Sequence, residues 1–307
     1  MAAMCSRCCW ARLSRRTQGE WWRSAPRSSG ARQSLQDFES SLQGGEALRL
    51  SCVTASYVMD LLGYPGKFDW GAASKAIEAA PLLPTLDSLL ERLAPARLDG
   101  LEIWFPHVAA ANLTPALASA VRQRLSERNM VCSACAGGIA DPSREPYAAE
   151  EAFQIAHLLK APLIAGHLPA STVRQLGPLC SHYAVRVGFE NGGEKGGDEI
   201  LSAIQGGNSW VGAAIDTGNM AAQGGDPVQA IRELRKKVIH VHFKDVPAVG
   251  SHECCALGQG IVDVPGVIGA LKAVGYDGWL SIEIETSDHD PTADIIASAE
   301  LLRRLWG

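Results

Sequence analysis

Long apolar runs and an excess of positive charge are both missing from this sequence. No segment approaches the roughly 18 consecutive apolar residues of a membrane-spanning helix. The formal net charge is -5 at pH 7, whereas proteins that bind nucleic acid or anionic membranes carry clustered Lys and Arg. We therefore expect neither a nucleic acid nor a membrane as a partner.

The cysteines lack a disulfide pattern. The nine cysteines are odd in number and scattered, which argues against the disulfide framework of a secreted protein. Cys132 and Cys135 form a C-x-x-C within an apolar run that predicts a strand. Because residues three apart on a regular strand face opposite ways, we interpret both as core residues rather than as ligands of one metal.

The first 45 residues differ from the rest of the chain. Their only acid before Asp37 is Glu20, serine is frequent, and no apolar periodicity is present. Such a segment buries too little apolar surface to offset chain entropy, so we expect residues 1–45 to form a disordered or loosely packed Arg/Ser-rich extension. An organellar transit segment and a translated extension without a role both fit this composition. We expect a cytoplasmic protein, or an organellar one if the extension is a transit segment.

Short β-rich runs alternate with amphipathic segments across residues 46–307. Parallel strands need crossovers of helical length, so this alternation predicts a single α/β domain. Eight such units close into a (β/α)8 TIM barrel of about 250 residues. An open doubly wound sheet is the alternative, but no G-x-G-x-x-G follows the first run. The eight runs are Leu48–Ala55, Leu101–Phe105, Met130–Ala136, Pro162–Ala165, Ala184–Phe189, Val211–Ile215, Val238–Phe243 and Trp279–Ile284.

Polar side chains recur at the C-terminal ends of the last four runs, where a barrel carries its active site. Glu190, Asp216 and His242 follow one another at intervals of 26 residues, about one strand-plus-helix unit, and Glu283 lies in the eighth run. Side chains that return once per unit at one height of the barrel converge in space. Three carboxylates buried together repel one another, and a divalent cation removes that repulsion. Oxygen and imidazole ligands favour Mn²⁺, Mg²⁺ or Co²⁺.

Spacing alone leaves the choice of ligand open in two of the runs. Period-two alternation puts His240 and Lys244 on the same face as His242. It likewise puts Glu285 on the same face as Glu283. Either histidine and either glutamate therefore satisfies the pattern.

Five motifs in the second half of the chain resemble those of a known family. They are VGFEN at 187–191, AIDTGN at 214–219, VIHVHFKD at 238–245, GQG at 258–260 and YDGWLSIEIE at 276–285. On these motifs, residues 46–307 resemble the sugar phosphate isomerase/epimerase family, which is similar to xylose isomerase and the ketose 3-epimerases. The resemblance implies that one divalent ion, Mn²⁺, Mg²⁺, Co²⁺ or Zn²⁺, is bound. It selects His242 over His240 and Glu283 over Glu285, so that the ligands are Glu190, Asp216, His242 and Glu283.

The resemblance also implies which side chains contact the substrate. His107 ends EIWFPH at 102–107 and His167 ends IAGH at 164–167, and both would face the mouth of the barrel. Asn219 and Lys244, which follow two of the ligands, join them as substrate-binding candidates. The ketose 3-epimerases carry a His in place of Asn219 and an Arg in place of Ala248, and both contact the sugar there. The resemblance therefore does not specify ketose 3-epimerase activity.

A site of this kind supports proton abstraction next to a carbonyl, with the cation stabilising an enediolate. The resemblance implies a divalent-metal-dependent isomerase or epimerase of a small sugar-type substrate, with Glu190 and Glu283 as the acid and base. Expulsion of a leaving group would instead make the protein a lyase or dehydratase of a keto-sugar, keto-inositol or oxidised glycoside. An apurinic-site endonuclease and a sugar-binding barrel without catalysis are the remaining alternatives. A homo-oligomer is left open.

Overall fold

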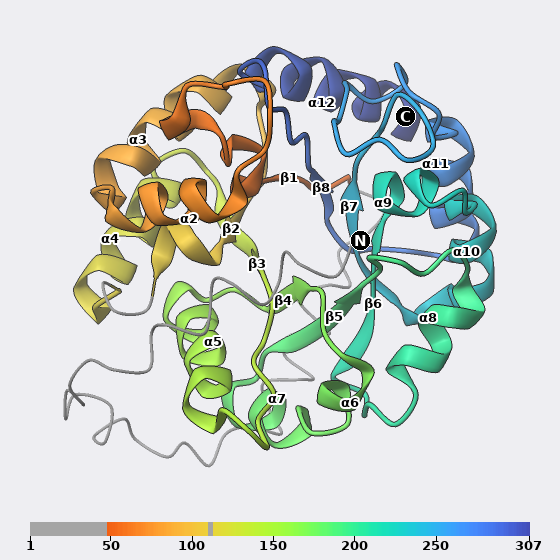
Figure 1. Cartoon of the computed structure of the whole chain (residues 1–307), viewed down its shortest axis with the longest axis horizontal. Helices are drawn as coiled ribbons and strands as arrows, with labels where there is room; N and C mark the ends of the chain where they lie inside the picture. The colour runs from red at the N-terminus through yellow and green to blue at the C-terminus, as the bar shows by residue number, and fades with distance from the viewer. Residues whose placement is uncertain (1–47, 110–112) are drawn as a thin grey trace.

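The structure, a computed structural model, describes residues 48–109 and 113–307. Within them the chain closes into a barrel of eight parallel strands in the order β1 to β8, ringed by helices (Figure 1). The predicted (β/α)8 architecture is confirmed. The extension expected over residues 1–45 lies outside the described residues. The strands are β1 (Leu50–Val53), β2 (Gly100–Trp104), β3 (Val131–Ala136), β4 (Leu163–Gly166), β5 (Arg186–Glu190), β6 (Val211–Asp216), β7 (Val238–Phe243) and β8 (Leu280–Ile282).

Several helices begin where a side chain can hold the free amides of the first turn. Asp226 accepts hydrogen bonds from the amides of Val228 and Gln229, and Thr114 accepts one from the amide of Leu117. Proline follows each of these caps, where its fixed φ suits a first helical residue. None of the helices in the described residues is long and apolar enough to cross a membrane. The α-helices are α2 (Trp70–Ala79), α3 (Leu82–Leu93), α4 (Pro115–Ser126), α5 (Pro146–Leu159), α6 (Ala170–Val173), α7 (Gly177–Tyr183), α8 (Gly197–Ile204), α9 (Thr217–Ala222), α10 (Pro227–Leu234), α11 (Val264–Ala273) and α12 (Thr292–Trp306), and the 3-10 helices are η2 (Thr54–Tyr57), η3 (Asp60–Leu62), η4 (Ala94–Ala96), η5 (Phe105–Val108) and η6 (Arg235–Lys237).

The barrel wall separates two apolar layers. A large core lies between the wall and the surrounding helices, whereas the barrel interior holds a small cluster formed by Ala134, Leu163, Ala165 and Ala214. Gly188 lies against this cluster, and a Cβ there would stand 2.8 Å from the Cβ of Ala214. Mostly small residues therefore line the β3–β6 side of the interior. This leaves space for larger polar side chains from β2 and β7.

A bulge in β3 changes the faces predicted for two cysteines. Leu101 of β2 pairs with Cys132, but the register then shifts by one residue, so that Ser133 is an extra residue in β3. Cys132 and Cys135 consequently point the same way, into the core beneath the helices. The prediction that they face opposite ways is wrong, because the bulge interrupts the period of two. Both are buried free thiols, as expected of core cysteines.

The segment between β1 and β2 contains η2, η3, α2 and α3 and packs beside one side of the barrel (orange in Figure 1). Trp70 of α2 meets Trp104 at the end of β2 edge to face, with ring centroids 5.8 Å apart. Arg92 of α3 pairs with Asp60 at 2.7 Å and with Asp290, which follows β8, at 3.0 Å. These contacts tie the insertion to the end of β2 and to the segment after β8, which are the neighbours of β1 in the barrel.

Candidate metal centre

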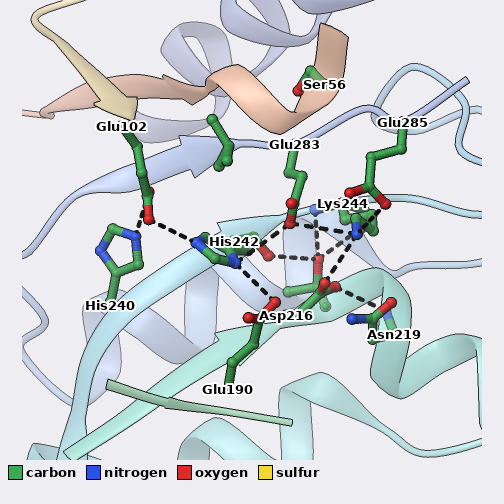
Figure 2. A network of polar contacts seen from close by, with 12 residues as sticks. Ser56, Glu102, Glu190, Asp216, Asn219, His240, His242, Lys244, Glu283 and Glu285 are labelled. Carbon is green, nitrogen blue, oxygen red and sulfur yellow. Dashed lines mark hydrogen bonds and ion pairs between the residues drawn. The ribbon is translucent and has the colours of Figure 1, made fainter. Parts of the chain in front are cut away.

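Four side chains from four neighbouring strands meet at the C-terminal end of the barrel (Figure 2). Glu190 ends β5, Asp216 ends β6, His242 lies in β7 and Glu283 directly follows β8. Each offers one donor atom, these atoms lie within 4.8 Å of one another, and all four residues are buried. The structure therefore brings together the four residues for which the sequence predicts a shared cation.

His242 lies between the two glutamates of this cluster. Its Nδ1 is 3.0 Å from Glu190 Oε1 and 3.3 Å from Glu283 Oε2. In Figure 2 the two glutamates approach the imidazole from opposite sides. One imidazole nitrogen thus faces both carboxylates to which the sequence assigns the acid and base roles.

The two glutamates differ in their affinity for a proton. Burial raises the pKa of Glu190, but the charges of His167, His242 and Lys244 outweigh burial and bring this pKa down to about 2. Burial raises the pKa of Glu283 to about 8, although the same lysine and His242 act in the opposite direction. Glu283 therefore holds a proton more readily than Glu190 does.

Lys244, directly after β7, supplies an ammonium group to the cluster. Its Nζ lies 3.2 Å from Asp216 Oδ2, 3.3 Å from Glu283 Oε2 and 3.0 Å from Glu285 Oε2. Burial lowers the pKa of Lys244, but these carboxylates outweigh burial and hold it well above its usual value. The buried lysine is therefore a cation held between three acids.

The backbone at the end of β7 is fixed by two further side chains. The Lys244 amide donates to Thr217 Oγ1 at 3.0 Å, and this hydroxyl donates to the Lys244 carbonyl oxygen at 2.6 Å. Asp245 is fully buried. Its carboxylate accepts hydrogen bonds from four backbone amides, so the loop that contains the GQG motif folds back onto the end of β7. These amides are those of Val246 (2.9 Å), Gly258 (2.9 Å), Gly260 (2.9 Å) and Val262 (3.0 Å).

The donor set fits a divalent cation. Asp216 Oδ2 and Glu283 Oε2 are buried and, apart from their ion pairs with Lys244 and His242, have no hydrogen-bond partner within the described residues. Burial lowers the pKa of His242, but nearby carboxylates outweigh burial and raise it, and burial raises the pKa of Glu283, so protons balance part of the negative charge of the cluster. A divalent cation beside Lys244 would balance three ionised carboxylates instead. Carboxylate oxygen and imidazole nitrogen are ligands that Mn²⁺, Mg²⁺, Co²⁺ and Zn²⁺ all accept. The four residues can therefore hold a metal ion, and they offer no sulfur ligand.

Two of the predicted substrate-binding residues border the cluster. His167 is half exposed, with Nδ1 3.2 Å from the Glu190 carbonyl oxygen and Nε2 3.8 Å from Glu190 Oε2. The backbone amide of Asn219 donates to Asp216 Oδ1 at 2.8 Å, so Asp216 caps helix α9 while its other oxygen faces the cluster. Figure 2 shows the Asn219 side chain beside Asp216. Both residues are thus placed where a bound molecule could reach them.

His107 occupies a different place. Its Nδ1 lies 3.2 Å from Thr54 Oγ1, and its ring meets Trp104 edge to face with centroids 6.0 Å apart. Burial lowers the pKa of His107 to about 4, so the ring is neutral at pH 7. These contacts join the ends of β1 and β2 rather than the four clustered residues.

Glu102 of β2 is a residue of the site that the sequence prediction misses. It is fully buried, with Oε2 2.7 Å from His240 Nε2 and Oε1 3.0 Å from His242 Nε2. Burial raises the pKa of Glu102, but the two histidines outweigh burial and hold it far below its usual value. A single acid within the apolar run of residues 101–105 was the available signal. His240, an alternative ligand by alternation, contacts this carboxylate.

A family model described as xylose isomerase-like TIM barrel matches residues 90–305. The rhizopine catabolism protein MocC of Rhizobium meliloti is 35% identical over 91 residues, which cover 24% of this chain and 28% of that protein. An inosose dehydratase of Lactiplantibacillus plantarum is 33% identical over 111 residues, which cover 31% of this chain and 36% of that enzyme. The match thus spans about a third of the length of each of these curated relatives.

Solved structures share the fold over most of the chain at low sequence identity. An L-ribulose 3-epimerase has a TM-score of 0.65 at 17% identity, and the match covers 85% of this chain and 95% of that one. The probable 3-DHS dehydratase AsbF of Bacillus anthracis has a TM-score of 0.61 at 16% identity, over 83% of this chain and 99% of that one. At these identities the likeness shows the barrel fold alone.

Proposed function

This chain belongs to the xylose isomerase-like TIM barrel family, and on that premise we propose that it is a divalent-metal-dependent enzyme that moves a proton next to the carbonyl group of a small keto-polyol. The observation that carries the proposal is the buried cluster of Glu190, Asp216, His242 and Glu283. A bound divalent cation would supply Lewis-acid stabilisation of negative charge on the substrate oxygens. The cation is proposed to be Mn²⁺, Mg²⁺, Co²⁺ or Zn²⁺.

Glu190 and Glu283 are proposed to exchange the substrate proton. They face one another across His242 Nδ1, at 3.0 Å and 3.3 Å from it, so a substrate held next to a cation at this point would have a carboxylate on each side. One carboxylate removes a proton from the carbon next to the carbonyl, and the other returns it on the opposite face or to the adjacent carbon. This pair supports either epimerisation or isomerisation.

Lys244 and His167 are proposed to hold the substrate. The ammonium group of Lys244 lies at the edge of the cluster and can donate a hydrogen bond to a substrate oxygen on which negative charge develops. His167 is half exposed beside Glu190, where it can donate to a hydroxyl further from the reacting carbon. Asp216 and His242 serve as ligands, and Asp216 is additionally fixed as the cap of α9.

Dehydration is the second candidate reaction, and the curated relatives favour it. The relatives include inosose dehydratases, which supports a cyclic keto-polyol as substrate. The first step is the same proton abstraction, after which the hydroxyl on the next carbon takes a proton from the second carboxyl group and leaves as water. Asn219 and Ala248 stand where the ketose 3-epimerases carry a His and an Arg, which weighs against ketose 3-epimerase activity.

Proton exchange in D₂O tests the proposal. The manganese-loaded protein is incubated with a panel of inososes and ketoses, and the EDTA-treated protein is the control. We expect deuterium on the carbon next to the carbonyl of at least one substrate, in the loaded protein only. A product that has lost one water identifies a dehydratase, and a product of otherwise unchanged mass identifies an isomerase or epimerase.

The other function classes predict different results in the same experiment. Binding of a keto-polyol without exchange would support a sugar-binding barrel. Cleavage of DNA at an abasic site, with two or three ions bound per chain, would support an endonuclease. Either result would contradict the proposed proton transfer.

A further inference from the structure

Glu102 lies on the side of His242 away from Lys244 and joins two histidines of the same strand (Figure 2). Its carboxylate is fully buried, and each oxygen has a different partner. Oε1 lies 3.0 Å from His242 Nε2, and Oε2 lies 2.7 Å from His240 Nε2. A carboxylate can only accept hydrogen bonds, so each of these nitrogens carries the proton and donates it. Both histidines are therefore Nε2–H donors to one acid.

This arrangement fixes which nitrogen of His242 is available as a ligand. Nδ1 lies 3.0 Å from Glu190 Oε1, which is also a hydrogen-bond distance, and 3.3 Å from Glu283 Oε2. Because Glu102 holds the proton on Nε2, Nδ1 is the nitrogen that can give up its proton and bind a cation. A neutral imidazole binds a metal through its unprotonated nitrogen. A hydrogen bond from the other nitrogen to a carboxylate also fixes the orientation of the ring.

His240 completes the arrangement from the side away from the cluster. It is fully buried, and its Nδ1 has no hydrogen-bond partner within the described residues. The hydrogen bond from its Nε2 to Glu102 therefore serves to orient the Glu102 carboxylate. By holding Oε2, His240 keeps the carboxylate in the plane where Oε1 meets His242.

A second metal ion among these three residues is the competing interpretation, because their donor atoms also lie close together. The distances of 2.7 Å and 3.0 Å between nitrogen and oxygen are those of hydrogen bonds. A structural metal site normally has four ligands, whereas this group offers three. The hydrogen-bonded interpretation therefore accounts for the geometry without an additional ion.

We propose that Glu102 is a positioning residue, braced by His240, that keeps the proton on Nε2 of His242, so that Nδ1 is the nitrogen left to bind the cation. The proposal rests on the metal site of the proposed function but not on the reaction. The positioning role concerns the protein without substrate, so it can be tested by measuring metal binding alone.

The test compares Glu102→Gln with the unaltered protein in titrations with Mn²⁺ alone. Glutamine has one acceptor oxygen and one donor nitrogen at these positions, so it cannot accept from both histidines, and one of them must change tautomer or turn. We expect Mn²⁺ affinity to fall about 10–100-fold, the usual effect of losing such a partner of a ligand. Isothermal titration calorimetry measures the affinity and the number of ions per chain.

Ser51→Ala is the matched control for disturbing the barrel interior. Ser51 is fully buried on β1, and its hydroxyl has no hydrogen-bond partner within the described residues. It pairs in register with Gly100 of β2, two residues before Glu102. We expect this variant to bind Mn²⁺ as the unaltered protein does. An equal loss of affinity in both variants would overturn the proposal, since it would reflect general loosening.

The tautomer itself can be observed. Nitrogen-15 NMR of histidine-labelled, Zn²⁺-loaded protein should show His242 with a proton on Nε2 and none on Nδ1. His240→Gln is the second variant, for the case that Glu102→Gln does not fold. It removes the imidazole that holds Glu102 Oε2 and leaves the bond between His242 and Oε1, so we expect a smaller fall in affinity, below about tenfold.

The remaining outcomes separate this proposal from the proposed function. A folded Glu102→Gln protein with unchanged Mn²⁺ affinity overturns the positioning role and leaves the proposed function standing. Two ions per chain in the unaltered protein, reduced to one in Glu102→Gln, would show that the group is a second metal site. Failure to find any proton exchange, with the expected affinities in all variants, would overturn only the proposed reaction.

Discussion

Lys244 donates a hydrogen bond of 3.0 Å to Glu285, the glutamate that the family resemblance leaves out of the ligand set. The two glutamates after β8 therefore have separate tasks in this arrangement. Glu283 lies among the four clustered donors, and Glu285 holds the ammonium group at their edge.

Replacing each of these glutamates by glutamine should separate the two tasks. For Glu283→Gln we expect turnover at saturating Mn²⁺ to fall by ~10²–10⁴-fold, as for loss of a general acid or base. For Glu285→Gln we expect roughly a tenfold fall, because one hydrogen bond to a charged group is weakened. Steady-state kinetics at several Mn²⁺ concentrations measures both. A larger effect of Glu285→Gln would mean that Glu285 is the ligand and Glu283 is not.

Asp216→Asn should weaken metal binding with little change in fold stability. The asparagine oxygen can still accept from the Asn219 amide and cap α9, while an amide nitrogen replaces Oδ2 in the cluster. We expect Mn²⁺ affinity to fall at least ~10-fold, with turnover partly restored by excess Mn²⁺. Asp216→Ala should lower Mn²⁺ affinity by the same factor. It should also lower the free energy of unfolding by about 1 kcal/mol, because alanine cannot cap α9. Full turnover of Asp216→Asn at low Mn²⁺ would contradict the ligand role.

Alanine at two glycines should have opposite effects on stability. A Cβ at Gly260 would stand 2.2 Å from the Val246 carbonyl oxygen and 2.3 Å from Asp245 Oδ1. Gly260→Ala should therefore disturb the four amides held by Asp245 and lower the free energy of unfolding by about 2–4 kcal/mol. A Cβ at Gly269, within α11, would meet nothing within 4 Å, so Gly269→Ala should raise it by about 0.5–1 kcal/mol. Urea denaturation checks both, and equal destabilisation would show that the clash at Gly260 is not decisive.

The ion pairs of Arg92 should make part of the stability depend on pH. Burial raises the pKa of Asp290, but hydrogen bonds from Thr292 and Arg92 outweigh burial and lower it below its usual value. Its contribution is therefore present above the pKa of an unfolded aspartate and is lost as pH falls through the lowered value. Because the pair is partly exposed, we expect only about 0.2–1 kcal/mol. Thermal unfolding of Asp290→Asn and the unaltered protein should differ at pH 7 and converge as the pH falls below the lowered pKa of Asp290. A difference that persists in acid would point to packing instead.

The alternation of short apolar runs with amphipathic segments was sufficient to predict the barrel, because each run corresponds to one observed strand. The equal intervals between Glu190, Asp216 and His242 were informative for the same reason, since a barrel returns each strand end to one height. These patterns are local and periodic, so they are visible in a single sequence.

What the sequence could not predict depends on contacts across the barrel. Glu102 precedes His242 by 140 residues, and no spacing rule relates β2 to β7. The bulge at Ser133 reversed the predicted relation between Cys132 and Cys135, because one extra residue shifts all later side chains to the other face. The ion pair of Lys244 with Glu285 likewise depends on where two chain segments leave the sheet.

The anchoring at the end of β7 has a consequence for the energy of reaction. Thr217 holds both the amide and the carbonyl of Lys244, and the neighbouring Asp245 binds four amides of its surroundings. The ammonium group can therefore move only by rotation of its own side chain. In the proposed reaction, negative charge that develops on a substrate oxygen would meet an ammonium group that is already in place, so the reorganisation energy of the step would be small. The stabilisation is built in when the chain folds, before any substrate arrives.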